Sequence, residues 1–210
     1  MGYREGSVEG YLADAAAGKD APGGGSVSAL AGALGAAMSC MVCNFTVGRE
    51  KFKEVEGRVK EILSAAEDGV RKLGELMDRD VEEYKKVTAA YKMPRGTEEE
   101  KAKRRAAIQE ALKSAMSAPL NTLRLCHKLI LDLKDLVEMG NPNLISDVGV
   151  AAILLAAALD GAKLNVEINL KFIKDTDLVE RTRKEIEEKA FEAKTVASEV
   201  VGKVRGRISG

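Results

Sequence analysis

Several residue types are scarce in this chain of 210 residues. It has no tryptophan, four tyrosines, four phenylalanines and a single histidine, His127. A Ser-His-Asp or Cys-His mechanism would depend wholly on that histidine, so nucleophilic triad chemistry is not expected. The three cysteines do not form a disulfide framework, and the N-terminal residues lack the charged-then-apolar layout of a signal peptide. We therefore expect the protein to work in the reducing cytoplasm.

The chain also lacks an excess of charge, because 33 Lys and Arg residues balance 33 Asp and Glu residues. A nucleic-acid-binding protein needs a clustered basic face, and the sequence contains no block of five or more Lys or Arg residues. Nucleic acid is therefore not an expected partner. A chain of this length can bury roughly 70% of the surface that it exposes when unfolded, so residues 1–210 are predicted to form a single domain.

Strand signals are nearly absent from the sequence. Ala, Glu, Lys and Leu are abundant, and no stretch alternates between apolar and polar residues over the length of a strand. The fold is predicted to be all-α, an up-and-down bundle of several helices. The helices are expected over residues 7–17, 26–47, 50–91, 97–119, 119–139, 146–175 and 176–205.

Residues with strong positional preferences set these helix limits. Pro119 should end or kink a helix, because proline lacks the N–H group that an internal turn needs. The predicted N-terminal caps are Ser26, the capping box of Thr97 and Glu100, Ser146, and Thr176 or Asp177.

The stretch from Ala21 to Gly48 carries no charge over 28 residues, which is long enough to span a bilayer. Membrane insertion is not expected, because Gly, Ala, Ser and Asn supply much of the stretch and it opens with a Pro-Gly loop. Small side chains recur every four residues, which lets another helix approach closely. We expect a buried central helix that also suits a subunit contact. The small ridge comprises Ser28, Gly32, Ala36, Cys40 and Asn44, and a second face carries Leu30, Leu34, Met38, Met41 and Phe45.

Asp80 lies in the middle of the apolar stripe of the predicted helix 50–91. At 100° per residue, its neighbours within about 40° on the helix wheel are Val55, Ile62, Gly69, Leu73, Leu76, Tyr84, Val87 and Tyr91. Asp78 points about 160° away and should face water. One interpretation of Asp80 is a structural carboxylate paired with a cation from another helix. The other is a general acid/base, since desolvation in an apolar pocket raises the pKa of a carboxyl group.

A glycine run, Gly23-Gly24-Gly25, precedes Ser26 at the start of a predicted helix. The free N–H groups and positive dipole end of such a turn suit an anion or a carbonyl oxygen. The run lacks the Gly-Lys-Ser/Thr end of a Walker loop, and no strand precedes it as a dinucleotide fingerprint requires. A tight turn between packed helices is the structural alternative.

The cysteines suggest a metal site only superficially. Cys40 and Cys43 form a C-x-x-C pattern inside a helix, where the simpler interpretation is two small buried residues. A zinc site would have to recruit Cys126 and His127, whose side chains diverge by about 100° on one helix. No metal is expected, and His127 is predicted to lie at the edge of the core.

Two groups of polar residues are further candidates. Asp147 and Asn165 share a face of the predicted helix 146–175, with Asn169 beside them, but they lie about 27 Å apart along its axis. One small ligand cannot touch both ends of a straight helix, although a second subunit or a bend in the helix can bring them into two related sites. Asp147 alternatively only complements the helix dipole. Arg49 begins a small basic cluster that suits carboxylate recognition, or is simply solvated.

Taken together, several segments resemble the cyclodeaminase/cyclohydrolase family of one-carbon folate enzymes. Order and spacing match along nearly the whole chain. The segments are Ala21–Ser26, Met41–Arg49, Asp80–Tyr84, Asn143–Gly149 and Asn165–Asn169, with Pro94, residues 97–101 and Pro119 between them.

The resemblance implies an all-helical homodimer that acts on a tetrahydrofolate derivative without metal or redox cofactor. The catalytic acid of the family falls on Asp80. The residues that occupy positions of the family's motifs, and that the resemblance places in the substrate pocket, are Gly23, Gly24, Gly25, Ser26, Arg49, Asp147, Asn165 and Asn169.

Three functions follow, in order of preference. The length and the Met-Val-Cys-Asn-Phe-Thr stretch favour a methenyltetrahydrofolate cyclohydrolase, which forms 10-formyltetrahydrofolate. A formimidoyltetrahydrofolate cyclodeaminase, which releases ammonia, is the alternative. A non-catalytic folate-binding or dimerisation module is the third, and Asp80 argues against it because a scaffold gains nothing from an acid in its core stripe.

Overall fold

The computed structural model describes residues 2–210, and within that range every regular element is helical. The all-α prediction is confirmed. The long helices are α1 (Val8–Ala16), α2 (Gly24–Asn44), α3 (Glu56–Lys92), α4 (Glu98–Met139), α5 (Ile145–Leu170) and α6 (Thr176–Ser209). Three short 3₁₀ helices join them: η1 (Tyr3–Glu5), η2 (Glu50–Phe52) and η3 (Pro142–Leu144).

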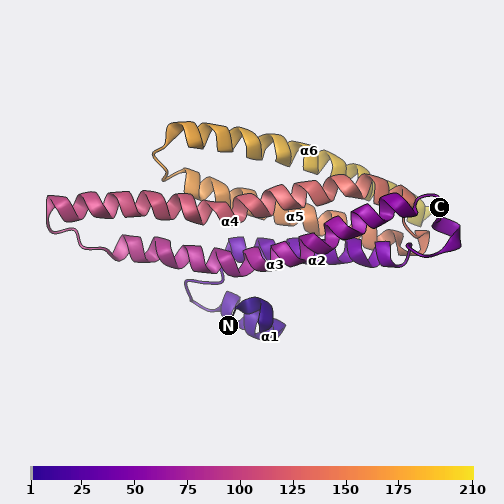
Figure 1. Ribbon diagram of the computed structural model, residues 1–210, viewed down its shortest axis with the longest axis horizontal. Helices are drawn as coiled ribbons and strands as arrows, with labels where there is room; N and C mark the ends of the chain where they lie inside the picture. Colours follow the sequence, from indigo (N-terminus) through magenta and orange to yellow (C-terminus); the bar gives the residue numbers. More distant parts are fainter. Residues whose placement is uncertain (1) are drawn as a thin grey trace.

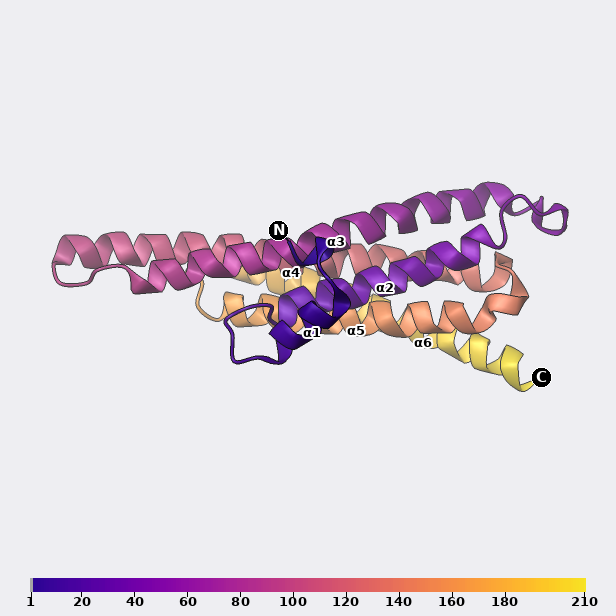
Figure 2. The same cartoon turned by 90° about the horizontal axis from the view of Figure 1, so that it is seen from below.

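Helices α2 to α6 run alternately up and down in an elongated bundle, and the short α1 lies outside it (Figure 1). Helix α2 contacts α3, α4 and α5, and α4 also contacts α3, α5 and α6. The C-terminal turns of α3 and the N-terminal turns of α4 project beyond α2 as a two-helix arm (Figure 2).

The small residues of α2 permit close packing on its neighbours. A Cβ atom at Gly32 would lie 2.9 Å from the Cys126 Sγ of α4, and one at Gly35 would lie 2.8 Å from the Leu155 Cγ of α5. Distances this short force a neighbour to move, so both positions exclude a larger residue. Of the small ridge predicted from the sequence, Ser28, Gly32 and Ala36 are buried, whereas Asn44 is exposed.

The opposite side of α2 is open, which differs from the expected burial at the centre of the bundle. Helices α2 and α5 lie side by side and both contact α4, so their free sides point away from α4 together. We name this surface the α2–α5 face. Its exposed apolar residues are Val27, Leu34 and Met41 of α2 with Phe45 directly after it, and Val150, Ile153, Leu164 and Ile168 of α5. In residues 2–210, the segments Gly24–Asn44 and Pro142–Leu170 are long and apolar enough to cross a membrane, although the bundle covers part of each.

The predicted break at Pro119 is wrong, because α4 continues from Glu98 to Met139 with this proline inside it. A proline within a helix costs about 3 kcal/mol. Helices α3 and α5 pack along α4, so tertiary contacts hold it continuous. Two predicted helices are therefore one.

Several predicted caps also differ from the structure. The capping box of Thr97 and Glu100 is confirmed. Helix α2 begins at Gly24 with Gly23 as its cap, so Ser26 is not a cap. The corresponding caps of α5 and α6 are Leu144 and Asp175, not Ser146 and Thr176 or Asp177, and residues 50–55 precede α3 instead of belonging to it.

Candidate active site

Asp80 lies on α3 against the first turn of α2, because the two helices run antiparallel and bring these residues level. Its side chain is half-buried beside Gly25, where a Cβ atom would overlap the carboxylate. The Ser26 backbone N–H belongs to the same first turn of α2 and acts on that carboxyl group through its pKa. Burial raises the pKa of Asp80 above the ordinary value of an aspartate, and the Ser26 N–H opposes part of this rise.

No cation neutralises Asp80 within residues 2–210. Charged groups do not contribute to the shift of its pKa, which arises from burial and from the Ser26 N–H alone. The interpretation of Asp80 as half of a structural ion pair is therefore wrong. An unpaired, partly desolvated carboxyl group whose pKa is raised is suited to accept and return a proton.

The glycine turn joins α2, α3 and α5 at one point. A Cβ at Gly24 would lie 3.2 Å from the Asn165 Nδ2 of α5, whereas one at Gly23 would meet nothing within 4 Å. Gly23 caps α2 without a side-chain hydrogen bond, and the Gly23 carbonyl oxygen accepts the first helical bond, from the Val27 N–H. The turn thus combines unused backbone donors with a neighbouring carboxyl group.

Asn165 and Asn169 extend the site along α5. Each is half-buried, and each donates its amide N–H to the backbone one turn earlier, Asn165 to the Gly161 carbonyl and Asn169 to the Asn165 carbonyl, both at 2.8 Å. These bonds fix the amide groups, and a Cβ at Gly24 would lie 3.5 Å from the Asn165 Oδ1. Asn165 therefore belongs with Asp80 and the glycine turn, and Asn169 follows one turn later.

Arg49 and Asp147 lie at the other end of the bundle. Helix α2, which has 21 residues and is therefore about 30 Å long, separates Arg49 from the glycine turn. Arg49 is exposed and donates its Nε–H to the Phe45 carbonyl at 3.2 Å, while Asp147 sits in the first turn of α5. One chain therefore does not bring these two residues to Asp80, and the predicted pocket is divided into two clusters.

Tyr11 is a residue of the site that sequence reasoning missed. It is the buried residue of α1, and its hydroxyl group shares a hydrogen bond of 3.0 Å with the Ser26 hydroxyl. Nothing in the local sequence predicts this contact, because it depends on how α1 folds back over α2. The available signal was only that Tyr11 lies on the apolar side of a short helix.

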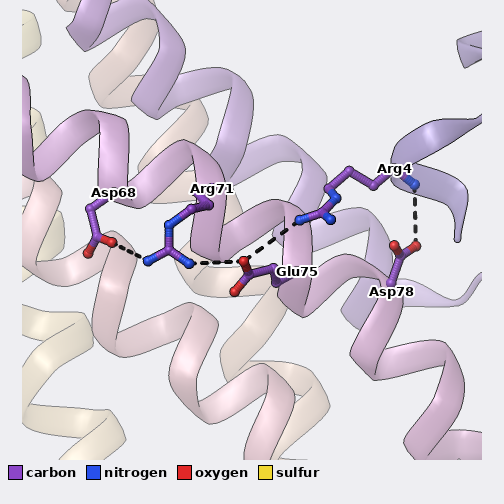
Figure 3. Close-up of polar contacts among 5 residues, drawn as sticks. All are labelled: Arg4, Asp68, Arg71, Glu75 and Asp78. Carbon is purple, nitrogen blue, oxygen red and sulfur yellow. Dashed lines mark hydrogen bonds and ion pairs between the residues drawn. The ribbon is translucent and has the colours of Figure 1, made fainter.

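Polar contacts fasten the segment before α1 to α3 (Figure 3). The Arg4 guanidinium lies 3.7 Å from Glu75, which Arg71 also binds, and Arg71 bonds Asp68 in turn. The Arg4 backbone N–H donates to Asp78 at 3.3 Å. Asp78 is half-buried under this segment, so the prediction that it faces water is wrong.

The cysteines and the histidine lie away from Asp80. Burial raises the pKa of the Cys40 thiol to about 11 and the pKa of the Cys43 thiol to about 12, so neither is a reactive thiolate. Cys126 is fully buried. His127 is also buried, which differs from the predicted place at the edge of the core, and its Nε2 lies 2.7 Å from Glu192 of α6.

Comparisons with known proteins show the family of the chain. Residues 7–188 match the family described as formiminotransferase-cyclodeaminase. A methenyltetrahydrofolate cyclohydrolase of Methylorubrum extorquens is 41% identical over 97% of this chain and 98% of its own. The formimidoyltransferase-cyclodeaminase of Rattus norvegicus is 35% identical over 96% of this chain, which spans 37% of that longer protein. The crystal structure of formiminotetrahydrofolate cyclodeaminase from Thermotoga maritima is similar with a TM-score of 0.79, 34% identity and coverage of 98% and 97%.

Proposed function

The chain belongs to the formiminotransferase-cyclodeaminase family and is an enzyme, and we propose that it hydrolyses 5,10-methenyltetrahydrofolate to 10-formyltetrahydrofolate. The observation that carries this choice is the 41% identity with a methenyltetrahydrofolate cyclohydrolase along nearly the full length of both chains. The unpaired carboxyl group of Asp80 is the group that we assign to the chemistry.

The reaction needs one group that takes a proton and returns it. Water adds to the cationic carbon between the two folate nitrogens, and a C–O bond forms as Asp80 accepts a proton from that water. Asp80 then gives the proton to N5 as the N5–C bond breaks, and the remaining hydroxyl proton passes to solvent. A raised pKa brings the carboxyl group closer to the pH at which it can do both. We propose no metal or redox cofactor for this reaction.

We assign substrate binding to the groups around Asp80. The backbone N–H groups of Gly23, Gly24 and Gly25 suit the pterin carbonyl or the oxygen that develops charge during the reaction. The amide oxygens of Asn165 and Asn169, which accept no hydrogen bond from residues 2–210, suit the N–H groups of the pterin. Ser26 contributes its backbone N–H to Asp80 and not directly to the substrate.

Cyclodeamination is the second candidate function, because the similar Thermotoga maritima structure carries that name. In that reaction the folate N10 attacks the formimino carbon, and ammonia leaves with a proton that the same carboxyl group can relay. Both reactions use one acid/base in one place, so Asp80 would serve either of them.

Separate assays with each substrate distinguish these functions. We expect the purified protein to decrease the absorbance of the methenyl chromophore without releasing ammonia. Release of ammonia from formimidoyltetrahydrofolate would support the second candidate. If neither signal exceeds that of a protein-free control, the chain is a non-catalytic folate-binding or dimerisation module and the proposal is wrong.

We further propose that two copies of the chain pair through the α2–α5 face. The face is apolar over the length of both helices, and burial of such a surface against a second copy removes it from water. In a two-fold pairing of antiparallel helices, the Asn44 end of one α2 lies beside the Gly24 end of the other. This pairing would bring together the two clusters of the predicted pocket, which lie at opposite ends of α2 in one chain.

This pairing supplies a place for Arg49 and Asp147. The partner subunit's Arg49 would then face the substrate bound at Asp80, where a guanidinium suits the carboxylates of the glutamate tail. The partner subunit's Asp147 would approach the pterin side from the start of α5. Each dimer would hold two such composite sites.

A charge in the middle of the α2–α5 face should dissociate the dimer. Leu34 is 52% exposed near the midpoint of α2, so Leu34→Glu leaves the core of the subunit intact but places two carboxylates at the interface. We expect a monomer by analytical ultracentrifugation and a loss of turnover. Phe191→Glu, at a residue of α6 that is 78% exposed and lies outside this face, is the control. A dimer that persists in Leu34→Glu would rule out this interface.

Mixing two inactive variants tests whether Arg49 acts across the interface. We expect Asp80→Asn and Arg49→Ala each to be weakly active alone and to regain activity after subunit exchange, because one site of the mixed dimer then holds both native residues. If Arg49 served its own subunit, every site of the mixed dimer would carry one defect. The absence of recovery would therefore contradict the composite site.

A further inference from the structure

Tyr11 connects the segment outside the bundle with the proposed active site. It is only 5% exposed, and its ring packs edge to face on that of Tyr3, with 5.2 Å between centroids. Its hydroxyl group reaches the fully buried Ser26 hydroxyl at 3.0 Å. The residue before Ser26, Gly25, lies directly against the Asp80 carboxylate, and the Ser26 backbone N–H lowers the pKa of that carboxyl group. A single residue of α2 therefore lies between Tyr11 and the carboxyl group.

The first turn of α2 has no side-chain cap, although the Ser28 hydroxyl donates to the Gly24 carbonyl at 2.7 Å. Its cap, Gly23, provides no side-chain hydrogen bond, and glycines occupy the next two positions. Glycines leave a turn with more conformational freedom than other residues do. A hydrogen bond from α1 to the Ser26 side chain restricts this freedom and thereby the direction of the Ser26 N–H.

We propose that Tyr11 is a positioning residue for the reaction, an inference that rests on the proposed function. Its hydrogen bond to the Ser26 hydroxyl holds the first turn of α2 so that the Ser26 N–H points at the Asp80 carboxylate. The ionised form of Asp80, which accepts the proton from water, is thereby stabilised. Tyr11 acts through Ser26 and does not itself contact the reacting atoms.

The contacts of Figure 3 keep Tyr11 in place. Arg4 joins the segment to Glu75 by its guanidinium and to Asp78 by its backbone N–H. The Tyr3 hydroxyl group donates a hydrogen bond of 2.9 Å to the Asp14 carboxylate, across the turn from η1 to α1. The segment is thus fastened to α3 on one side and closed on itself on the other.

Few charged groups are free to shift the pKa of Asp80. Helix α2 carries none, and neither does the part of α4 between Ser114 and Leu123. On α3, Glu83 turns to Ser114 and Lys86 at 2.6 and 2.8 Å, and Asp78 lies under the Arg4 N–H. On α1, Asp14 bonds Lys19 and Tyr3, and on α5, Lys163 pairs with Glu167 and Glu187. A change in the pKa of Asp80 would therefore report on its burial and on the Ser26 N–H.

Replacement of Tyr11 by phenylalanine removes one hydroxyl group and keeps the ring. The hydrogen bond from Ser26 lowers the pKa of Asp80, so weakening it should raise that pKa. We expect Tyr11→Phe to shift the acidic limb of the pH profile of kcat/KM upward, by up to about one pH unit. Ser26→Ala should give a similar shift, and the double variant should give no more than either, because both changes break the same bond.

Tyr3→Phe is the matched control, since it removes a hydroxyl group from the same segment without touching Ser26. A carboxyl ¹³C NMR titration, with Asp80 assigned by comparison with Asp80→Asn, measures the pKa without substrate. This titration tests the proposal even if the assays reject cyclohydrolase activity. An unchanged Asp80 pKa in Tyr11→Phe would overturn it, as would an equal change in Tyr3→Phe.

Discussion

Asp80→Asn should fold normally and lose methenyltetrahydrofolate turnover by roughly 10²–10⁴-fold, the usual contribution of a general acid/base. Asparagine has the same shape and can still accept the hydrogen bond from Ser26, but it cannot take a proton from water. The measurement is kcat and KM by the decay of the methenyl absorbance. We expect kcat to fall while KM changes little, because the contacts assigned to substrate binding lie on α2 and α5.

The stability of the variant separates lost chemistry from lost folding. Burial raises the pKa of Asp80 in the folded protein, so folding favours its protonated form. Above that pKa, the ionised carboxylate lowers the free energy of unfolding. Asparagine is neutral and therefore does not lower the stability in this way. Asp80→Asn should therefore melt at the same temperature as the native protein or higher at neutral pH, and the difference should shrink as the pH falls and Asp80 becomes protonated.

Asp78→Asn is the matched control on the same helix. Asp78 contacts the Arg4 backbone N–H and not the glycine turn, so its carboxyl group has no assigned part in proton transfer. Little effect on kcat is expected. An equal loss in the two variants would show that the effect arises from the negative charge of α3 and would refute the assignment of Asp80.

Gly25→Ala should have the second largest effect. The added methyl group would overlap the Asp80 carboxylate, so either that carboxylate or the first turn of α2 must move. A displacement of about 1 Å can cost about 10²-fold in rate. Alanine also favours a helix over glycine by about 1 kcal/mol, which offsets part of the strain. We therefore expect kcat/KM to fall far more than the melting temperature.

Gly23→Ala tests whether the effect belongs to the clash. A Cβ at Gly23 would meet nothing within 4 Å, and its φ of −105° is accessible to alanine. This variant should retain most of the turnover, with kcat/KM measured in the same assay. If Gly23→Ala and Gly25→Ala lose activity equally, flexibility of the turn and not its contact with Asp80 is what the reaction requires.

The sequence was sufficient to predict that Asp80 is partly buried, because helical periodicity is a local property. The angle of Asp80 within its apolar stripe depends only on the spacing of its neighbours. The glycine run similarly marks a close backbone approach, which the structure places at that carboxyl group. In both cases the relevant physics lies within one helix or one turn.

Other features depend on contacts between distant residues, which spacing does not reveal. Tyr11 reaches Ser26 only because α1 folds over α2. The sequence predicts that a helix ends or kinks at Pro119, yet α4 continues through it because α3 and α5 pack along α4. The division of the predicted pocket follows from the length of α2, and the residue types alone did not indicate which end of a helix would meet which neighbour.

The scarcity of aromatic residues gives the protein an internal optical probe. Without tryptophan, its ultraviolet fluorescence comes from tyrosine, and of the four tyrosines only Tyr11 is buried. Emission from a tyrosine depends on its hydrogen bonding and its solvent, so the shielded fraction of the signal originates next to Asp80. Collisional quenchers would reach Tyr84 and Tyr91, which are exposed, and leave a residual signal from Tyr11 and from the half-buried Tyr3 that packs on it.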